Sequence, residues 1–220
     1  LPITAMSMSL PTFISQTVGA GKIDRAKKGT NYNGEVMYIS ANADVIINDG
    51  TITGGNSRTG ASGIHIKDNA RVVLNDVNLV DNSAVEGANG AAIAVYNGAT
   101  LVMNGGSLSD NAMKYDAIVI LLPVIPCYPY GTLYVEDATA TLNNVTISNN
   151  RSGSTDVEGV AIYADSSTVT LNDCVVSGNI NNEKVHYAES VIGAEDSTLI
   201  INNTDFTDNG QAGETNDSDY

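Results

Sequence analysis

Four aspartates recur at matching places in this chain, and carboxylates are the residue type here best able to do chemistry. They are Asp68, Asp137, Asp165 and Asp196, and each follows a short apolar segment. A row of carboxylates could supply the general acid and base that cleave a glycosidic bond, or the oxygen ligands of a calcium ion. Aspartate is also a common turn residue, and turn formation is the simpler interpretation. We therefore expect no catalytic residue, metal site or cofactor, with calcium at the Asp and Asn turns as the alternative.

The elements that would hold these aspartates repeat along the chain, and six asparagines mark the repeat. Successive asparagines are 27, 29, 39, 29 and 30 residues apart. Intervals of about 20 to 50 residues are typical of solenoid proteins, in which each repeat packs only on its neighbours. The six are Asn48, Asn75, Asn104, Asn143, Asn172 and Asn202.

Apolar residues alternate around each of these asparagines. Apolar residues stand three residues before it, one residue before it and four residues after it. Around Asn75, for example, these are Val72, Leu74 and Leu79. The alternation predicts two strands that bend at the asparagine, with one face turned inward. A further strand precedes them in each repeat, which makes three strands per coil. Its expected outward residues are Tyr38, His65 and Tyr134, together with Tyr163, whose register stays ambiguous.

Stacked copies of this unit predict an all-β fold, a right-handed parallel β-helix of about six coils. We expect the six asparagines to stand at an inner corner as an internal ladder, in which each amide bonds the amides above and below. The alternative is that asparagine serves only as a turn residue. A second asparagine follows each of the six after seven or eight residues, at Asn56, Asn82, Asn111, Asn150, Asn179 and Asn209.

The segments around the second asparagine carry a family resemblance. They read LVDN, LSDN, ISNN, VSGN and FTDN, and NGAAIAV and SGIHI lie ahead of the first asparagine. These segments resemble the passenger repeats of polymorphic outer-membrane proteins and related bacterial surface adhesins, which carry an FxxN element and GGA followed by Ile, Leu or Val. FTDN matches the first element and NGAAI nearly matches the second, within roughly residues 35–210. The resemblance implies a β-helix outside the cell or at its surface.

The expected function is that of a non-enzymatic structural or adhesive surface protein that self-associates into a filament. Two alternatives stay open: a β-helical carbohydrate-active enzyme, either polysaccharide lyase or glycoside hydrolase, and a passive stalk of a larger surface adhesin. Such enzymes need clustered carboxylates beside an Arg or His. His65 and His186 lie about four coils apart, and neither has an obvious carboxylate partner in register. The NTD, DD, GHG and RIK elements of polygalacturonases are absent.

The charge of the chain is strongly negative and unevenly distributed. The formal net charge is −15, which disfavours nucleic acid and anionic polysaccharides as partners. Residues 1–30 carry +3, and the remaining residues therefore carry −18. No apolar stretch is long enough to span a membrane as a helix. The opening LPITAMSMSL shows no secretory signal, so either a signal peptide has been removed from an extracellular or cell-surface protein, or the resemblance misleads about export.

Two cysteines do not suffice for a disulfide framework. Cys174 falls in an inward column, where it is expected to be a small core residue. A bond between Cys174 and Cys127 is the alternative.

Two segments outside the repeat pattern are candidate interfaces. Residues 1–30 combine an uncharged, strand-patterned extension with a basic connector, and residues 31–211 form the β-helix, which an apolar insertion interrupts at about 117–134. Residues 212–220 form an acidic tail. We expect the extension to join a neighbouring copy in a homo-oligomer or filament; the alternative is that it caps its own helix. We expect the insertion to contact a partner; the alternative is that it folds over the barrel. The host or cell surface would supply any other partner, as a glycan or a protein. The candidate interface residues are Met6, Met8, Leu10, Phe13, Leu121, Leu122, Val124, Ile125, Tyr128 and Tyr130.

Overall fold

The computed structural model describes six stretches of the chain. They are residues 33–58, 60–85, 88–114, 130–153, 159–181 and 190–211. The expected N-terminal extension, the acidic tail and most of the apolar insertion lie outside these stretches.

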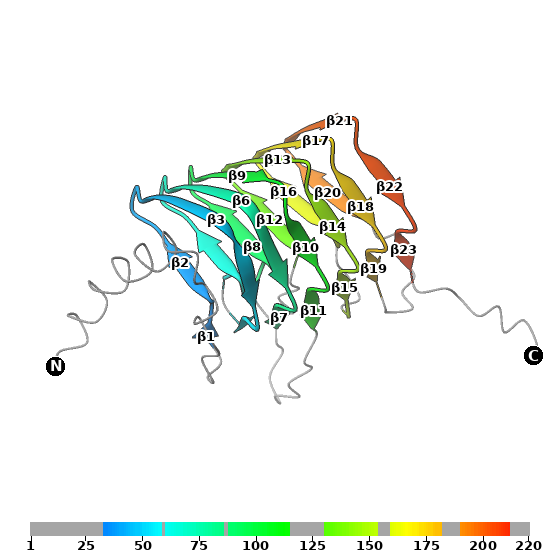
Figure 1. The fold of residues 1–220 in the computed structure, drawn as a ribbon, viewed down its shortest axis with the longest axis horizontal. Coiled ribbons are helices and arrows are strands. Elements are labelled where there is room, and N and C mark those ends of the chain that lie inside the picture. Colours follow the sequence, from blue (N-terminus) through cyan, green and yellow to red (C-terminus); the bar gives the residue numbers. More distant parts are fainter. Residues whose placement is uncertain are drawn as a thin grey trace, which may run out of the picture.

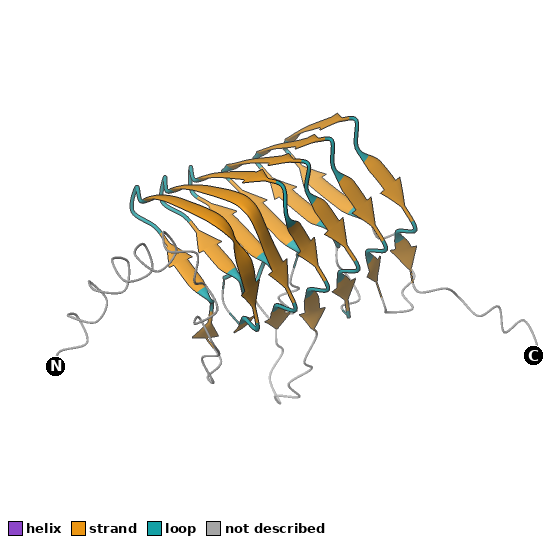
Figure 2. Ribbon diagram, in the orientation of Figure 1, coloured by secondary structure: helices purple, strands orange, loops and turns teal. Residues whose placement is uncertain are grey.

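Strands from six successive repeats stack into a parallel β-solenoid of about five turns (Figure 1). The predicted all-β fold is confirmed, and Figure 2 shows strands and loops but no helix in the described residues. The strands form three sheets, and every pairing is parallel except that of β1 with β4. Parallel stacking at about 4.8 Å per level places equivalent residues of successive repeats directly above one another.

The first sheet has six strands, one from each repeat. They are β2 (Met37–Ile39), β5 (Ile64–Ile66), β8 (Ile93–Tyr96), β12 (Leu133–Glu136), β16 (Ile162–Asp165) and β20 (Ile192–Glu195). The third sheet has seven short strands. They are β1 (Asn33–Gly34), β4 (Asn56–Ser57), β7 (Ser83–Val85), β11 (Ala112–Lys114), β15 (Arg151–Ser152), β19 (Ile180–Asn181) and β23 (Gly210–Gln211).

The second sheet carries the six asparagines of the repeat. Its first two strands, β3 (Asp44–Thr53) and β6 (Arg71–Val80), run through the bend, whereas later repeats break there into two strands. The later strands are β9 (Thr100–Asn104), β10 (Ser107–Ser109), β13 (Thr139–Asn143), β14 (Thr146–Ser148), β17 (Thr168–Asn172), β18 (Val175–Ser177), β21 (Thr198–Asn202) and β22 (Asp205–Thr207). The predicted register is confirmed, since each asparagine pairs with the next from Asn48 to Asn202.

The apolar columns on either side of the asparagines form one continuous core. The column just before the asparagine is fully buried through five levels, at Ile47, Leu74, Met103, Leu142 and Leu171. Cys174 joins the same core, with 2% of its surface exposed, and it is a free thiol. The expectation that Cys174 is a small core residue is therefore confirmed.

The bend after each asparagine is made by a residue in the left-handed backbone region. These residues are Asp49 (φ 59°), Asp76 (φ 53°), Gly105 (φ 71°), Asn144 (φ 54°), Asp173 (φ 53°) and Asn203 (φ 44°). Asp, Asn and Gly adopt this region at the lowest cost, because a short polar side chain bonds locally and glycine has no Cβ. The local sequence thus explains why the chain turns at this column.

The six asparagines form a hydrogen-bonded ladder, which we call the outer ladder. The amide nitrogen of each asparagine donates to the amide oxygen of the asparagine one level nearer the N-terminus, over 2.7 to 2.9 Å. The predicted ladder is therefore confirmed, but its expected position is wrong. Asn48, Asn104 and Asn202 are exposed, and the other three are only partly covered, so this ladder is not internal.

The internal ladder is built from the second asparagine of the repeat, and we call it the inner ladder. Asn82, Asn111, Asn150 and Asn179 are at most 1% exposed. Asn111 illustrates the contacts: its backbone N–H and its Nδ2 both donate to Asn150 Oδ1, at 2.9 and 3.0 Å, and Nδ2 also donates to the Leu79 carbonyl at 3.0 Å. Its own Oδ1 accepts from Asn82. Each buried amide is thus satisfied by the levels above and below it.

The N-terminal member of the second asparagine set lies outside this inner column. Asn56 pairs with Ser83, and it is Gly55 whose N–H donates to Asn82 Oδ1 at 3.0 Å. Asn56 follows its first asparagine after eight residues rather than seven, and this extra residue moves it one place along the strand.

We predict that truncating the inner ladder costs far more than truncating the outer ladder. Asn111→Ala should lower the free energy of unfolding by about 2–4 kcal/mol, because the buried N–H and Nδ2 of Asn82 lose their acceptor. Asn104→Ala, the matched change at the same repeat, should cost about 1 kcal/mol or less, since water can replace an exposed bond. Urea denaturation of both variants measures the difference. Equal losses would contradict the assignment of the inner ladder.

Two glycines with nearly equal backbone angles offer a second test. Gly106 has φ 80° and Gly54 has φ 75°, but a Cβ on Gly106 would collide with the carbonyl oxygen of Val77 in the level below, whereas Gly54 faces open space. Gly54→Ala should cost about 1–2 kcal/mol for the backbone angle alone. Gly106→Ala should cost about 3 kcal/mol or more, because the two levels must also separate. Thermal melts would refute the close approach if the two variants behaved alike.

Candidate functional site

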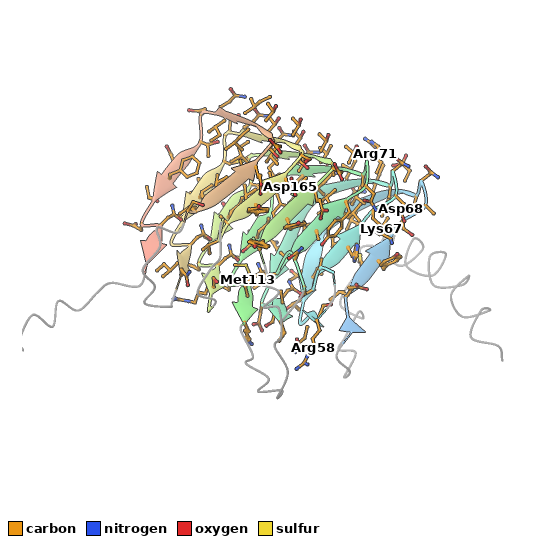
Figure 3. The ribbon with its side chains drawn as sticks, turned by 180° about the vertical axis from the view of Figure 1, so that it is seen from behind. Arg58, Lys67, Asp68, Arg71, Met113 and Asp165 are labelled. Atoms are coloured by element: carbon orange, nitrogen blue, oxygen red, sulfur yellow. The ribbon has the colours of Figure 1, made fainter. Side chains whose placement is uncertain are left out.

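Three of the four candidate carboxylates lie in turns, as the simpler interpretation of the sequence predicted. Asp68, Asp137 and Asp196 follow strands of the first sheet with φ between 45° and 56°. The placement of Asp165 in the same column is wrong. Asp165 ends strand β16 and pairs with Glu136 and Glu195, and it is Ser166 that takes the left-handed turn position, with φ 49°. Figure 3 labels Asp165 and Asp68 and shows them at separate levels of the stack.

His65 has a carboxylate neighbour that is not in register with it, since the residue that pairs with His65 is Tyr38. Its Nδ1 lies 3.2 Å from Glu35 Oε1. Its ring packs between Tyr38 and Tyr96, with centroid distances of 5.1 Å to each. Glu35 comes from the preceding repeat and lies outside the periodic strand pattern, so the alternation alone could not reveal this pair. His186 lies outside the described residues.

Outward aromatic rings continue from His65 along the first sheet, and we call them the tyrosine row. The contacts run from Tyr96 to Tyr134 (5.4 Å between centroids) and from Tyr134 to Tyr163 (5.7 Å, planes 11° apart). Tyr163 pairs directly with Tyr134, which resolves its ambiguous register. Tyr130 stacks on Tyr163 at 4.7 Å. The outward positions expected for Tyr38, His65 and Tyr134 are confirmed.

A column of carboxylates runs beside the tyrosine row. Glu136, Asp165 and Glu195 occupy successive levels in one register. The hydroxyl of Tyr134 donates to Glu136 Oε2 and that of Tyr163 to Glu195 Oε2, each at 3.0 Å. Both rings are less than 10% exposed although they lie on the outer face of the sheet. The tyrosine row therefore packs on itself and on its carboxylates, and these two rings present no free face to a sugar.

The buried hydroxyls of the tyrosine row resist ionisation. Burial raises the pKa of Tyr134 and of Tyr96 well above the usual tyrosine range, and the negative charge of Glu136 raises both further. In the folded protein these two hydroxyls keep their protons at higher pH than an exposed tyrosine does.

Metal-ligating groups do not converge within the described stretches. No group of three or more His, Cys, Asp or Glu side chains there could hold a metal ion. The described residues also include no helix long and apolar enough to cross a membrane.

The last described level of the solenoid exposes residues that are core at the other levels. Ile201 and Phe206 are 43% and 44% exposed, whereas their partners one level below, Leu171 and Val176, are fully buried. Strands β20, β21, β22 and β23 are the last strands of their sheets and pair on one side only among the described residues. We call this surface the open end; in Figure 1 it lies opposite β1 and β2.

The open end is also acidic. Residues 190–211 contain Glu195, Asp196, Asp205 and Asp208 and no Lys, Arg or His. This level therefore combines an apolar centre, an acidic rim and strand edges that pair on one side only among the described residues. The sequence places Phe206 of FTDN in the inward column, but its exposure is visible only in the structure.

The candidate interface residues fall almost entirely outside the described stretches. Tyr130 is the exception, and it is half-buried in the tyrosine row of its own chain. The sequence-based hypothesis that the remaining nine contact a partner stays a prediction.

The comparisons with known proteins identify no relative. No protein-family model, curated protein or solved structure matches the chain. The β-solenoid that the resemblance implied is present, whereas none of the three comparisons links the chain to the polymorphic outer-membrane proteins.

The raised tyrosine pKa values predict a loss of stability in alkali. Tyrosines of the unfolded chain ionise near about pH 10, whereas Tyr134 and Tyr96 keep their protons in the fold. The unfolded state then binds fewer protons, so the free energy of unfolding falls as the pH rises above about 10. Tyr134→Phe removes one of these groups, and its melting temperature should fall less steeply from about pH 9 to 11 than that of the unmodified protein. Parallel slopes would argue against a buried hydroxyl at this position.

Proposed function

We propose that the chain is a non-enzymatic structural solenoid of an extracellular surface that self-associates through its open end. The observation that carries the proposal is the exposure of Ile201 and Phe206 in columns that are otherwise core. An uncovered coil offers both apolar surface and unpaired backbone groups. A partner that covers this end would satisfy both.

The energetics favour association at this surface. Burying a side chain of the size of Ile or Phe stabilises a contact by about 1.5–3 kcal/mol. Leu199 and Ile192 are partly exposed beside Ile201 and would be covered together with it. Backbone hydrogen bonds along four edge strands would add to the apolar contact.

An extracellular, adhesive role is supported by the resemblance of the repeats to bacterial surface adhesins. The fold presents long, regular outer columns, among them Thr100, Thr139 and Thr168, on which a glycan or protein of a host or cell surface could lie. The net charge of −15 speaks against nucleic acid as that partner.

A non-enzymatic role is supported by the contacts of the candidate carboxylates. Asp68 accepts a hydrogen bond from Asn97 of the next level at 3.3 Å, and Asp165 accepts one from the neighbouring Ser166 at 3.0 Å. Glu136 and Glu195 accept from tyrosine hydroxyls of the same face. These side chains have structural partners, whereas the alternative of a lyase or glycoside hydrolase needs carboxylates that face the substrate.

Two neighbouring residues of β21 test the self-association. Ile200 and Ile201 are 42% and 43% exposed, but Ile200 points outward from the sheet and Ile201 continues the core column. Light scattering of the unmodified protein should show larger species as the concentration rises. Ile201→Asn should raise the concentration at which these larger species appear by at least about tenfold, the equivalent of about 1.4 kcal/mol. Ile200→Asn should leave that concentration unchanged.

Two outcomes would overturn the proposal. A protein that stays monomeric up to high concentration is a passive stalk, which was the second alternative. Release of reducing or unsaturated ends from a panel of polysaccharides, abolished by Glu136→Gln or Asp165→Asn, would establish the enzyme.

A further inference from the structure

We propose that the tyrosine row is a relay for one-electron oxidation. A peroxyl radical takes an electron and a proton from the exposed Tyr38, and the oxidation then moves along the row to the buried rings of Tyr134 and Tyr163. Glu136 and Glu195 receive the phenol protons of these two rings. Such a relay is a second property of the molecule and is independent of its proposed self-association.

The aromatic rings form a continuous path along the first sheet. The strands that carry them, β2, β5, β8, β12 and β16, lie side by side (Figure 1). Ring centroids are 5.1 Å apart from Tyr38 to His65 and again from His65 to Tyr96. The path continues to Tyr134 at 5.4 Å and from there to Tyr163 at 5.7 Å. Each separation lies within the range of about 4.5–7 Å at which aromatic side chains are in contact, so an electron can pass from ring to ring.

The two ends of this path differ in their access to solvent. Tyr38 is 50% exposed, whereas Tyr134 and Tyr163 are buried. A dissolved radical can therefore meet the phenol of Tyr38 directly, but it reaches the two buried phenols only through the row. A radical that settles on a buried ring is shielded from other solutes, so it outlives a radical on Tyr38.

Charges beside the rings favour oxidation of the buried end. The ammonium group of Lys67 lies 5.5 Å from the ring centroid of Tyr38. A positive charge at that distance opposes the loss of an electron from the ring. At the other end, the carboxylates of Glu136 and Glu195 accept hydrogen bonds from the two buried hydroxyls, and their negative charge stabilises an electron-deficient ring. The electron vacancy therefore moves inward, away from Lys67.

The same carboxylates solve the problem of the phenol proton. An oxidised tyrosine is a strong acid and must release this proton, yet burial keeps Tyr134 and Tyr163 from giving it to bulk water. The hydroxyl of Tyr134 lies 3.0 Å from Glu136 Oε2, and that of Tyr163 lies 3.0 Å from Glu195 Oε2. Each proton can thus cross a hydrogen bond that already exists, while the electron leaves through the row.

The two steps balance in atoms and electrons. In the first step the peroxyl radical ROO• takes a hydrogen atom from Tyr38, which yields the hydroperoxide ROOH and the phenoxyl radical of Tyr38. In the second step Tyr38 regains an electron from the row and a proton from water. Tyr134 supplies that electron and passes its own proton to Glu136. The products are ROOH, the phenoxyl radical of Tyr134 and a protonated Glu136.

Pulse radiolysis of the full chain tests where the radical settles. Trichloromethylperoxyl radicals, formed by a short pulse, should produce tyrosyl absorption that decays in a fast phase and a slow phase. Tyr134→Phe with Tyr163→Phe should abolish the slow phase, because phenylalanine fills the same space but has no hydroxyl to oxidise. Tyr220→Phe, a control outside the row, should leave the slow phase unchanged. A slow phase that persists in the double variant would overturn the relay.

Tyr38→Phe tests the entry point of the oxidation. Tyr38 is half exposed, so its substitution should leave the fold intact, which circular dichroism checks. The slow phase should lose most of its amplitude although Tyr134 and Tyr163 are still present. An unchanged slow phase would mean that the oxidant reaches the buried rings by another route, and the relay would be refuted.

A matched set of carboxylate substitutions tests the proton transfer. Glutamine keeps a carbonyl oxygen that accepts the tyrosine hydrogen bond, but it can neither take the proton nor supply a negative charge. Glu136→Gln with Glu195→Gln should therefore lower the amplitude of the slow phase at least about fivefold. Glu35→Gln, which changes the carboxylate beside His65, should lower it less than about twofold. Equal effects of the two variants would contradict the assigned proton acceptors.

Discussion

The buried amides of the inner ladder are the constraint on which the rest of the molecule depends. A buried amide that lacks partners costs more than its hydrogen bonds return, so Asn111 and its equivalents are tolerable only when the levels above and below stand in register. The amide of Asn111 binds the Leu79 carbonyl and the Asn82 N–H of the preceding level and the Asn150 amide of the next level, which holds the three levels in register. A slip by one residue would leave every member of the ladder unsatisfied at once.

The outer ladder runs in the opposite direction and has a different role. Its amide nitrogens donate toward the N-terminal level, whereas those of the inner ladder donate toward the C-terminal level. The outer asparagines mark the bend at which a residue such as Asp76 or Asn144 takes the left-handed conformation. Together the two columns define the cross-section of each coil: one stabilises it from inside and the other closes its corner at the surface.

A stack held in this way has regular sides and two special ends, and its functional surfaces follow from that geometry. On the first sheet, equivalent outward residues meet level after level, which brings Tyr134, Tyr163 and their carboxylates together. At the last described level the residue types of these columns stay apolar, and Ile201 and Phe206 are exposed there. On the sides of the solenoid, the described outward residues thus find partners on neighbouring levels.

The sequence by itself determined the repeat, the strand columns, their register and the outward tyrosines, because each depends on local alternation and on turn residues such as Asp76. It could not decide which asparagine column lies inside. Asn104 and Asn111 are the same residue type beside similar apolar neighbours, and only the closure of the coil buries one and exposes the other. The pair of His65 with Glu35 and the exposure of Ile201 were likewise decided by tertiary structure, since both depend on what the next level does or does not cover.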